Sequence, residues 1–288
     1  MEKYGLVLEG GGVRGAYTAG ALAWLSDHHV TFDYGVGISS GAMYMTCYWQ
    51  NQTKMAYDIA IHYATNPENV GLQSLLHCGY YVDYGRLFDT CLLGEAHYSV
   101  MKLKAEKAPI EIGAYSLEKG KTVYFNAHDL DENLTVIRAT VALPIASAIV
   151  KIDGSPYLDG GITKMIPIER SLEQGVTKHL VITTKPADYV RKPANRLVIF
   201  LMRLFYRSFP QIVCDYKARH LNYKKQVDLV EKLVQEGKAM NIRPSRTISI
   251  SRFKGSPKNC EELYQLGYAD MEARRLELET FLGRTINN

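Results

Sequence analysis

The sequence predicts an α/β fold of three layers, α/β/α, in which helices cover both faces of a mostly parallel central sheet. Strand-like and helix-like segments alternate through the first two thirds of the 288 residues, as expected for parallel strands joined by helices. A hydrophobic content of 47% is enough to bury a substantial core. Beyond a change of composition at Pro186–Pro193, long amphipathic segments dominate. We therefore expect an α/β domain over residues 1–188 and a largely helical C-terminal extension, residues 189–288, packed on its core.

Short apolar runs and the spacing of apolar residues in longer segments predict the individual elements. Strands are expected at Tyr4–Leu8, Tyr34–Gly37, Ile110–Ser116, Thr122–Asn126 and His179–Thr184. Helices are expected at Ala16–His28, from Gly41 onward, and at Thr53–Thr65, Leu134–Ala142, Asn195–Tyr206, Asp215–Gln235 and Asn259–Leu282. We expect a turn at Ser155–Gly161 and a strand-like run at Thr247–Ser251.

Charge, cysteine content and hydropathy exclude several classes of protein. The formal net charge of +4 is small and evenly spread, which argues against nucleic-acid binding but leaves a modest preference for anionic membranes. The five cysteines are scattered and form no metal-binding pattern, so we expect reduced thiols, no metal and no cofactor. The N-terminal apolar run is too short for a signal peptide, and no segment is long enough for a membrane span. These observations predict a cytoplasmic protein.

The first of two glycine-rich turns follows the strand expected at Tyr4–Leu8. It consists of Gly10, Gly11, Gly12, Val13, Arg14 and Gly15. Its GxGxxG spacing also fits a dinucleotide site, but such a site needs an acidic residue at the end of the second strand, and Asp33 precedes that strand. Three consecutive glycines before a helix favour a loop whose backbone N–H groups approach developing negative charge. Arg14 is expected to lock this loop, to face a substrate headgroup or to form a structural ion pair.

The second glycine-rich turn places a serine between a strand and a helix. Gly37-Ile38-Ser39-Ser40-Gly41 has the GxSxG pattern, which in a strand–turn–helix setting lifts a serine hydroxyl above the sheet edge. The positive N-terminus of the following helix would stabilise charge near Ser39, so we take Ser39 as the nucleophile. Ser40 is expected to cap that helix.

The base for this serine is predicted to be an aspartate. None of the eight histidines lies in the glycine or small-residue loop typical of a catalytic histidine. Asp159 is followed by Gly160 and Gly161, which allow it to approach another loop closely. Taken alone, this segment is also consistent with a simple hairpin containing an Asp-Gly turn.

Together these motifs resemble those of the patatin-like phospholipases over roughly residues 4–185. Gly10–Gly15 resembles the family's GGGxRG oxyanion loop, Gly37–Gly41 its GxSxG motif and Asp159–Gly161 its DGG motif, and Ala139–Pro144 resembles the segment before the DGG. The resemblance implies a Ser39–Asp159 dyad supported by Gly37, Gly41, Gly160 and Gly161. The oxyanion donors would be the amides of Gly11, Gly12 and Val13. Met165 stands where the family often has an asparagine.

The resemblance implies a lipid ester as substrate, with phospholipid or lysophospholipid first and neutral glycerides or short acyl esters next. A thioesterase or general carboxylesterase stays open, as does a catalytically weak lipid-binding or regulatory protein of the same fold. The basic and apolar segment 191–207 would rest on a lipid surface, cap the site, or pack as a buried amphipathic helix with solvated arginines. The sequence does not predict an oligomeric state.

Overall fold

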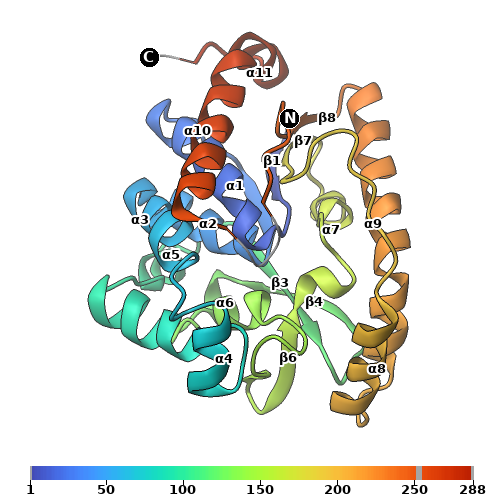
Figure 1. Ribbon diagram of the computed structural model, residues 1–288. Coiled ribbons are helices and arrows are strands. Elements are labelled where there is room, and N and C mark those ends of the chain that lie inside the picture. Colours follow the sequence, from blue (N-terminus) through green and yellow to red (C-terminus); the bar gives the residue numbers. More distant parts are fainter. Residues whose placement is uncertain (1, 251–254, 287–288) are drawn as a thin grey trace.

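The computed structural model describes residues 2–250 and 255–286 and contains one mixed, mostly parallel sheet (Figure 1). Its strands are β1 (Tyr4–Leu8), β2 (Tyr34–Ile38), β3 (Ile110–Ser116), β4 (Lys121–Asn126), β5 (Val150–Ile152), β6 (Ser155–Asp159), β7 (Lys178–Ile182) and β8 (Ala239–Ile242). Their order is β5-β6-β3-β2-β1-β7-β8, with β4 pairing to β3. Strands β3, β2, β1, β7 and β8 are parallel neighbours, whereas β4 and β6 run antiparallel to β3, and β5 antiparallel to β6.

The helices of the described residues connect and cover these strands. They are α1 (Ala16–Asp27), α2 (Ser40–Trp49), α3 (Thr53–Asp58), α4 (Leu72–Cys78), α5 (Met101–Ala105), α6 (Thr135–Val141), α7 (Ile168–Glu173), α8 (Arg196–Phe205), α9 (Gln211–Gln235), α10 (Pro257–Ala273) and α11 (Arg275–Leu282). Two π-helical segments, Ile59–Tyr63 and Arg86–Glu95, and three short 3₁₀ turns, Gly12–Gly15, Ala127–Asp129 and Gly160–Ile162, complete the set.

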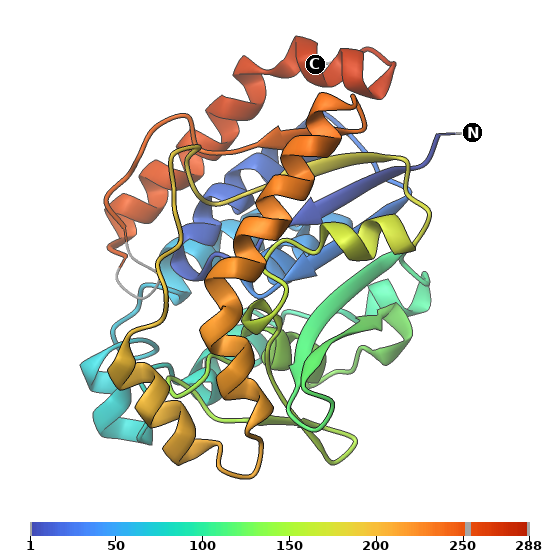
Figure 2. The ribbon, with the colours of Figure 1, turned by 90° about the vertical axis from the view of Figure 1, so that its right-hand side faces the viewer.

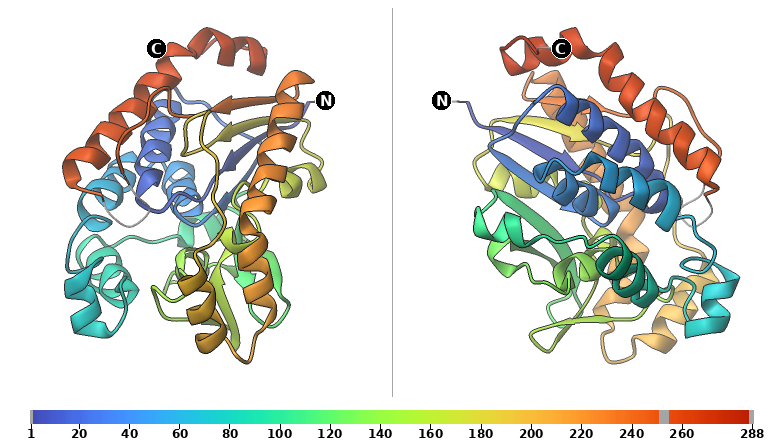
Figure 3. Two further views of the ribbon diagram at one scale, coloured as in Figure 1. Left: turned by 45° about the vertical axis from the view of Figure 1, so that its right-hand side comes forward. Right: turned by 90° about the vertical axis from the view of Figure 1, so that its left-hand side faces the viewer.

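Side chains of the parallel strands alternate between two apolar layers, as strand geometry requires. Leu6 and Leu8 of β1 pack with α1, α2 and α10 on one face, while Val7 packs with α7 and α9 on the other. Figure 2 shows α9 and α7 in front of the sheet, and the right panel of Figure 3 shows α1, α2 and α10 over the opposite face. The predicted three-layer α/β/α class is confirmed by this arrangement.

The C-terminal region shares the core of the preceding chain. Strand β8 pairs in parallel with β7 and so extends the central sheet. Helix α10 packs along α1, where Gly20 and Gly267 allow the backbones to meet: a Cβ on Gly267 would lie 2.1 Å from the Tyr17 carbonyl oxygen. The Tyr17 hydroxyl also donates a 3.0 Å hydrogen bond to Asp270. The region is largely helical, as expected, but it also supplies a strand, and the boundary at residue 188 stays a prediction.

Two predicted elements are wrong. Ser155–Gly161, expected as a turn, contains strand β6; the Asp-Gly turn of this hairpin is Asp153-Gly154, where both φ angles are positive (49° and 81°) as a type I′ turn requires. Thr247–Ile250 forms no strand, because side chains take its carbonyls: Arg14 bonds to Ile250 and Asn259 to Ser249. The last residue of that predicted run, Ser251, lies outside the described residues.

Other boundaries differ in detail. The helix expected at Asn259–Leu282 is divided into α10 and α11 at Arg274, and the one expected at Thr53–Thr65 changes from α3 to a π-helical turn. Strands β5 and β8 were not expected, since a run of three or four residues carries too little periodicity to be recognised.

Substitution of Gly267 by alanine tests the close packing of α1 and α10. In an exposed helix this change gains up to about 1 kcal/mol of stability. Here we expect a loss of about 1–3 kcal/mol, because the added methyl group would overlap the Tyr17 carbonyl. Urea unfolding measures the difference, with Gln265→Ala on the exposed side of α10 as the control. A Gly267→Ala variant as stable as this control would contradict the close packing.

The burial of His179 in β7 should make the stability of the fold depend on pH. The side chain is fully buried, contacts the Ser171 hydroxyl through Nδ1 at 2.9 Å, and burial lowers its pKa to about 4. Between pH 6.5 and 4 the unfolded chain therefore binds a proton that the folded chain does not, and stability falls as the pH falls. We expect this residue to account for up to about 3 kcal/mol over that range.

Urea unfolding of the wild type and His179→Gln at pH 7 and pH 5 isolates this contribution. The wild type should lose more stability than the variant over this interval. Equal losses would mean that His179 does not titrate abnormally.

Candidate active site

Strand β3 brings the predicted nucleophile and base together. Strand β2 is parallel to β3 and ends at Ile38, which pairs with Gly113. Strand β6 is antiparallel to β3 and ends at Asp159, which pairs with Ala114. The two strands therefore run toward each other along β3, and their C-terminal ends meet one residue apart. Ser39 and Asp159, 120 residues apart in the sequence, become neighbours.

Ser39 occupies a strained turn between β2 and α2. Its φ of 55° and ψ of −130° are uncommon for a residue with a side chain, and such strain is often stored at functional sites. The side chain is 4% exposed, and its hydroxyl donates a 2.8 Å hydrogen bond to Oδ2 of Asp159. The Ser39 amide donates to the Thr140 hydroxyl of α6 at 2.8 Å, and that hydroxyl donates to the Gly113 carbonyl. Thr140 thus ties the turn to β3.

Hydrogen bonds hold both the carboxylate and the backbone of Asp159. Its Oδ1 accepts a 2.7 Å hydrogen bond from the Gly161 amide, which leaves Oδ2 directed at Ser39. The Asp159 backbone amide donates to the Ala142 carbonyl at 2.7 Å. The segment Ala139–Pro144 therefore contacts both members of the pair, through Thr140 and Ala142. Gly160 begins the short 3₁₀ turn that follows.

The first glycine loop lies directly against the serine turn. A Cβ on Gly10 would be 3.1 Å from Cβ of Ser39, and a Cβ on Gly41 would be 2.6 Å from the Glu9 carbonyl oxygen. Gly37 packs equally closely on the start of α2. Side chains at these positions would push the two turns apart.

The amides of this loop are not equivalent. The Gly10 amide donates to the Met165 carbonyl, and the Gly11 amide donates to the Ser40 hydroxyl, both at 3.0 Å. Within residues 2–250 and 255–286, no hydrogen bond from the amides of Gly12 or Val13 is present. Gly12, with φ of 60°, and Val13 both border the cavity next to Ser39. The structure therefore leaves two of the three expected amides open, because Ser40 occupies the third.

Ser40 and Arg14 take roles in holding this loop. The expectation that Ser40 caps α2 is wrong: the N-cap position is Ser39, and the Ser40 hydroxyl accepts from Gly11 instead. Arg14 Nε donates to the Ile250 carbonyl oxygen at 3.3 Å, which links the glycine loop to the C-terminal region. Gly15 packs against the Ser40 side chain.

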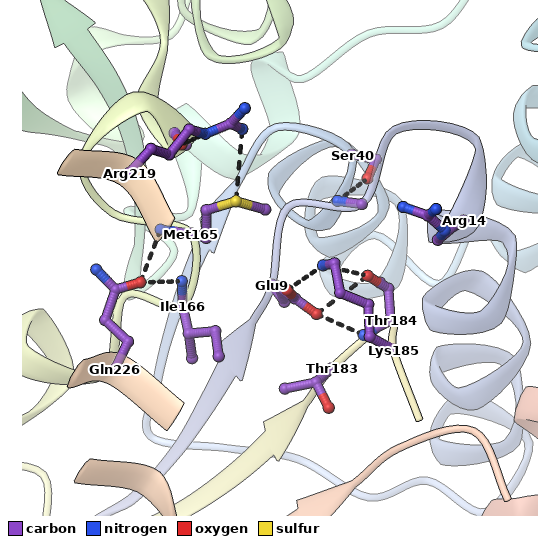
Figure 4. A network of polar contacts seen from close by, with 12 residues as sticks. Glu9, Arg14, Ser40, Met165, Ile166, Thr183, Thr184, Lys185, Arg219 and Gln226 are labelled. Atoms are coloured by element: carbon purple, nitrogen blue, oxygen red, sulfur yellow. Dashed lines mark hydrogen bonds and ion pairs between the residues drawn. The ribbon is translucent and has the colours of Figure 1, made fainter. Parts of the chain in front are cut away.

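Helix α9 supports the loop that follows Asp159 (Figure 4). Arg219, 5% exposed, donates to the Gly161 carbonyl at 2.6 Å and contacts the Met165 sulfur at 3.4 Å. Gln226, 2% exposed, accepts hydrogen bonds from the amides of Met165 and Ile166 at 3.0 Å each. Side chains from α9 thus hold the loop in which Met165 replaces the expected asparagine.

A buried ion pair lies behind the glycine loop, also shown in Figure 4. Glu9, fully buried at the end of β1, forms an ion pair with Lys185 and accepts hydrogen bonds from the Thr184 amide and hydroxyl at 2.6 and 3.0 Å. Burial lowers the pKa of Lys185 to about 8, although Glu9 acts in the opposite direction. The pair joins the β1 end, from which the glycine loop starts, to the segment after β7.

An apolar cavity opens beside Ser39. It measures about 80 Å³, and its wall includes Met43, Tyr44, Val70, Val82 and Leu143. This is about half of the roughly 150 Å³ that holds one benzene molecule in an engineered protein cavity. The cavity therefore has room for a short apolar group next to the serine hydroxyl.

The described residues offer no group of three or more histidine, cysteine, aspartate or glutamate side chains that could hold a metal ion. In the same residues, none of the helices combines the length and the hydropathy that crossing a bilayer requires.

Five residues that contact the site or its loops are not among the predicted site residues: Thr140, Arg219, Gln226, Glu9 and Lys185. Thr140 lies within Ala139–Pro144, the segment that resembles the family's sequence before the DGG motif. That resemblance is the one sequence signal that could have indicated a role for Thr140. The other four become recognisable only when distant parts of the chain are brought together.

Two segments of the chain match models of known protein families. Residues 6–77, which include the glycine loop and the serine turn, match the family model of the patatin-like phospholipases. The predicted resemblance to this family is therefore confirmed, and the family model locates it at residues 6–77. Residues 209–283, which include α9 and α10, match a second family model, described as a domain of unknown function (DUF6363).

The chain is also similar to individual proteins of known sequence or structure. The chain is 32% identical over 202 residues to the uncharacterized protein YjjU of Escherichia coli strain K12. The match covers 65% of this chain and 54% of YjjU, so the chain spans about half the length of this relative. Among solved structures, VipD from Legionella pneumophila matches 95% of this chain and 66% of its own, with 11% identity and a TM-score of 0.46.

A double-mutant cycle tests the ion pair behind the glycine loop. Removing one partner leaves the other charge buried, so Glu9→Gln and Lys185→Met should each lose about 3–5 kcal/mol of unfolding free energy. The double variant should lose clearly less than the sum of the two single losses, because it leaves neither charge unpaired. Urea unfolding at neutral pH measures all four proteins. Simple additivity of the two losses would show that the charges do not interact.

Proposed function

We propose that this protein is a serine acyl hydrolase that cleaves carboxylic esters of lipids, of the phospholipase A or lysophospholipase type. The observation that carries the proposal is the hydrogen bond of 2.8 Å from the Ser39 hydroxyl to Oδ2 of Asp159, in a buried site at the end of β2. The patatin-like phospholipase match over residues 6–77 supports a lipid ester as the substrate class.

In the proposed reaction Ser39 attacks the ester carbonyl while Asp159 accepts its proton. The bond from Gly161 to Oδ1 fixes the carboxylate so that Oδ2 faces the hydroxyl in the orientation that proton transfer needs. Asp159 then returns the proton to the departing alcohol, and an acyl ester on Ser39 results. Water, deprotonated by the same carboxylate, then attacks that ester; the fatty acid leaves, and Asp159 returns the proton to the Ser39 oxygen.

The amides of Gly12 and Val13 are the proposed donors to the oxyanion of the tetrahedral intermediate. Both border the cavity beside Ser39, and neither donates to another described residue. Losing one such donor costs about 3 kcal/mol of transition-state stabilisation. The Gly11 amide supports this arrangement indirectly, through its bond to Ser40.

A carboxylesterase acting on short acyl chains is the second candidate, and cavity size is the observation that favours it. The cavity of about 80 Å³ accepts the first carbons of an acyl chain but not a whole fatty acid. A long-chain substrate would need the surrounding segments, which include Val70 and Val82, to move apart. Comparing turnover of short and long p-nitrophenyl esters with that of phospholipids separates the two candidates.

Labelling with a fluorophosphonate tests the Ser39–Asp159 dyad. Intact mass should show one adduct on the wild type and none on Ser39→Ala. Asp159→Asn should react at least about 100-fold more slowly, because it removes the general base. Ser26→Ala, which changes a serine at the end of α1, serves as the control and should label like the wild type.

Two results would contradict the proposal. A folded wild type that takes no label would argue for a lipid-binding or regulatory protein of this fold. Normal labelling of Asp159→Asn would remove Asp159 from the base role.

A further inference from the structure

Large apolar side chains are exposed mainly in two segments of the described chain. Of fourteen such side chains, eight belong to α4 with the residues just after it, or to α8. They are Leu72, Leu75, Leu76, Tyr80, Leu197, Phe200, Leu204 and Phe205. We call these eight residues the α4–α8 surface. Scattered exposed leucines are ordinary, but a concentration of this kind marks an interaction site.

Helix α8 is apolar on two sides, and only one of them is covered. Met202 is fully buried against α9 and its neighbours. Leu197, Phe200 and Leu204, spaced three and four residues apart, lie on the outer side and are 63%, 60% and 48% exposed. The segment is thus neither a fully buried helix nor one with a polar outer face.

Helix α4 presents a similar outer face. Leu72, Leu75 and Leu76 share one side of the helix and are 68%, 43% and 79% exposed, whereas Ser74 is buried on the other side. The hydrogen bond from Ser74 Oγ to the Tyr80 carbonyl holds the helix against the residues that follow it. The leucines therefore point outward from an anchored helix.

The two helices are joined through one loop. The Ile145 amide donates to the Tyr206 hydroxyl at the end of α8, and the Ala146 carbonyl accepts from the Val82 amide after α4. Tyr80 is close enough to contribute to the raised pKa of Tyr206, which burial mainly causes. Both panels of Figure 3, and Figure 2, show α4 and α8 at the same end of the molecule. The two helices that carry most of these side chains thus lie at one end of the molecule and are linked through residues 145 and 146.

This region borders the candidate active site. Val70 and Val82, which pair on either side of α4, line the cavity beside Ser39. Leu143, just before the joining loop, lines it as well. A molecule that leaves a lipid layer at the α4–α8 surface would therefore be close to the serine.

The charged residues of segment 191–207 have a single sign. Segment 191–207 contains five basic residues and no acidic residue. Arg196 and Arg203 of α8 are exposed on the same side as Phe200, and Arg207, two residues after the end of the helix, is exposed as well. Among the described residues, none of these three arginines forms an ion pair. Cations beside outward apolar side chains are typical of helices that lie in the interface of an anionic membrane.

We propose that the α4–α8 surface docks the protein onto an anionic lipid bilayer, with its leucine and phenylalanine side chains inserted among the headgroups and the arginines of α8 on the phosphates. Docking deepens the proposed function, since it delivers membrane lipid to the cavity at Ser39. It does not require catalysis, so it is measurable on its own.

Sedimentation with vesicles tests this proposal on the full chain. The wild type should pellet with vesicles of phosphatidylcholine and phosphatidylserine, weakly with phosphatidylcholine alone, and less as salt is added. Phe200→Asp and Leu76→Asp should each reduce the binding constant at least about tenfold, because a carboxylate replaces an inserted apolar group. Arg203→Gln should reduce it roughly fivefold.

The control is Leu276→Asp. Leu276 is 77% exposed on α11, at the opposite end of the molecule from α4 and α8 (Figure 1), so this variant should bind vesicles like the wild type. Turnover of a water-soluble short-chain ester by Phe200→Asp and Leu76→Asp should stay unchanged, which shows that they are folded and keeps docking separate from catalysis. Vesicle binding by Ser39→Ala should equal that of the wild type.

Three outcomes would overturn the proposal. One is a wild type that does not bind anionic vesicles, which would indicate that the α4–α8 surface binds a protein partner instead of a membrane. Another is an equal loss of binding in Leu276→Asp. The third is a stable dimer of the wild type that Phe200→Asp dissociates, since a second copy of the chain would then cover the surface. If Ser39 takes no fluorophosphonate label but vesicles still bind, only the proposed function fails.

Discussion

The candidate site depends on one constraint of sheet geometry: two strands run toward each other along the same side of β3. Because β2 is parallel to β3 and β6 is antiparallel, both present their C-terminal ends at the same point, beside Gly113 and Ala114. Ser39 leaves one end and Asp159 the other. The positions of both side chains are thus set by backbone pairing, and the strained turn at Ser39 is held by its surroundings rather than by flexible loops.

Much of this site could be predicted because its signals are local. The glycine loop, the serine turn and the DGG segment each fit within six residues, and the central strands are short, mostly apolar runs. The roles of Ser40, Arg219 and Gln226 could not be predicted, because each depends on a partner that only the tertiary fold supplies. Gly11 is 29 residues from Ser40, and Met165 is 61 residues from Gln226. No pattern along the chain marks such pairs.

The two family matches describe segments that form one physical unit. The patatin-like segment, residues 6–77, and the C-terminal segment, residues 209–283, share an apolar core in which α10 packs on α1. Strand β8 extends the sheet, and α9 covers its other face. The C-terminal segment also holds the loop at Met165. Within this chain, segment 209–283 therefore completes the core and holds the loop after Asp159.

The support from α9 also sets the order in which the site can be assembled during synthesis. The ribosome releases Ser39 and Asp159 long before Arg219 and Gln226, which hold the loop after the aspartate. A nascent chain that does not yet include α9 therefore carries Ser39 and Asp159 without the side chains that hold the loop after the aspartate. The hydrogen bonds at Gly161, Met165 and Ile166 can form only after α9 has been synthesised.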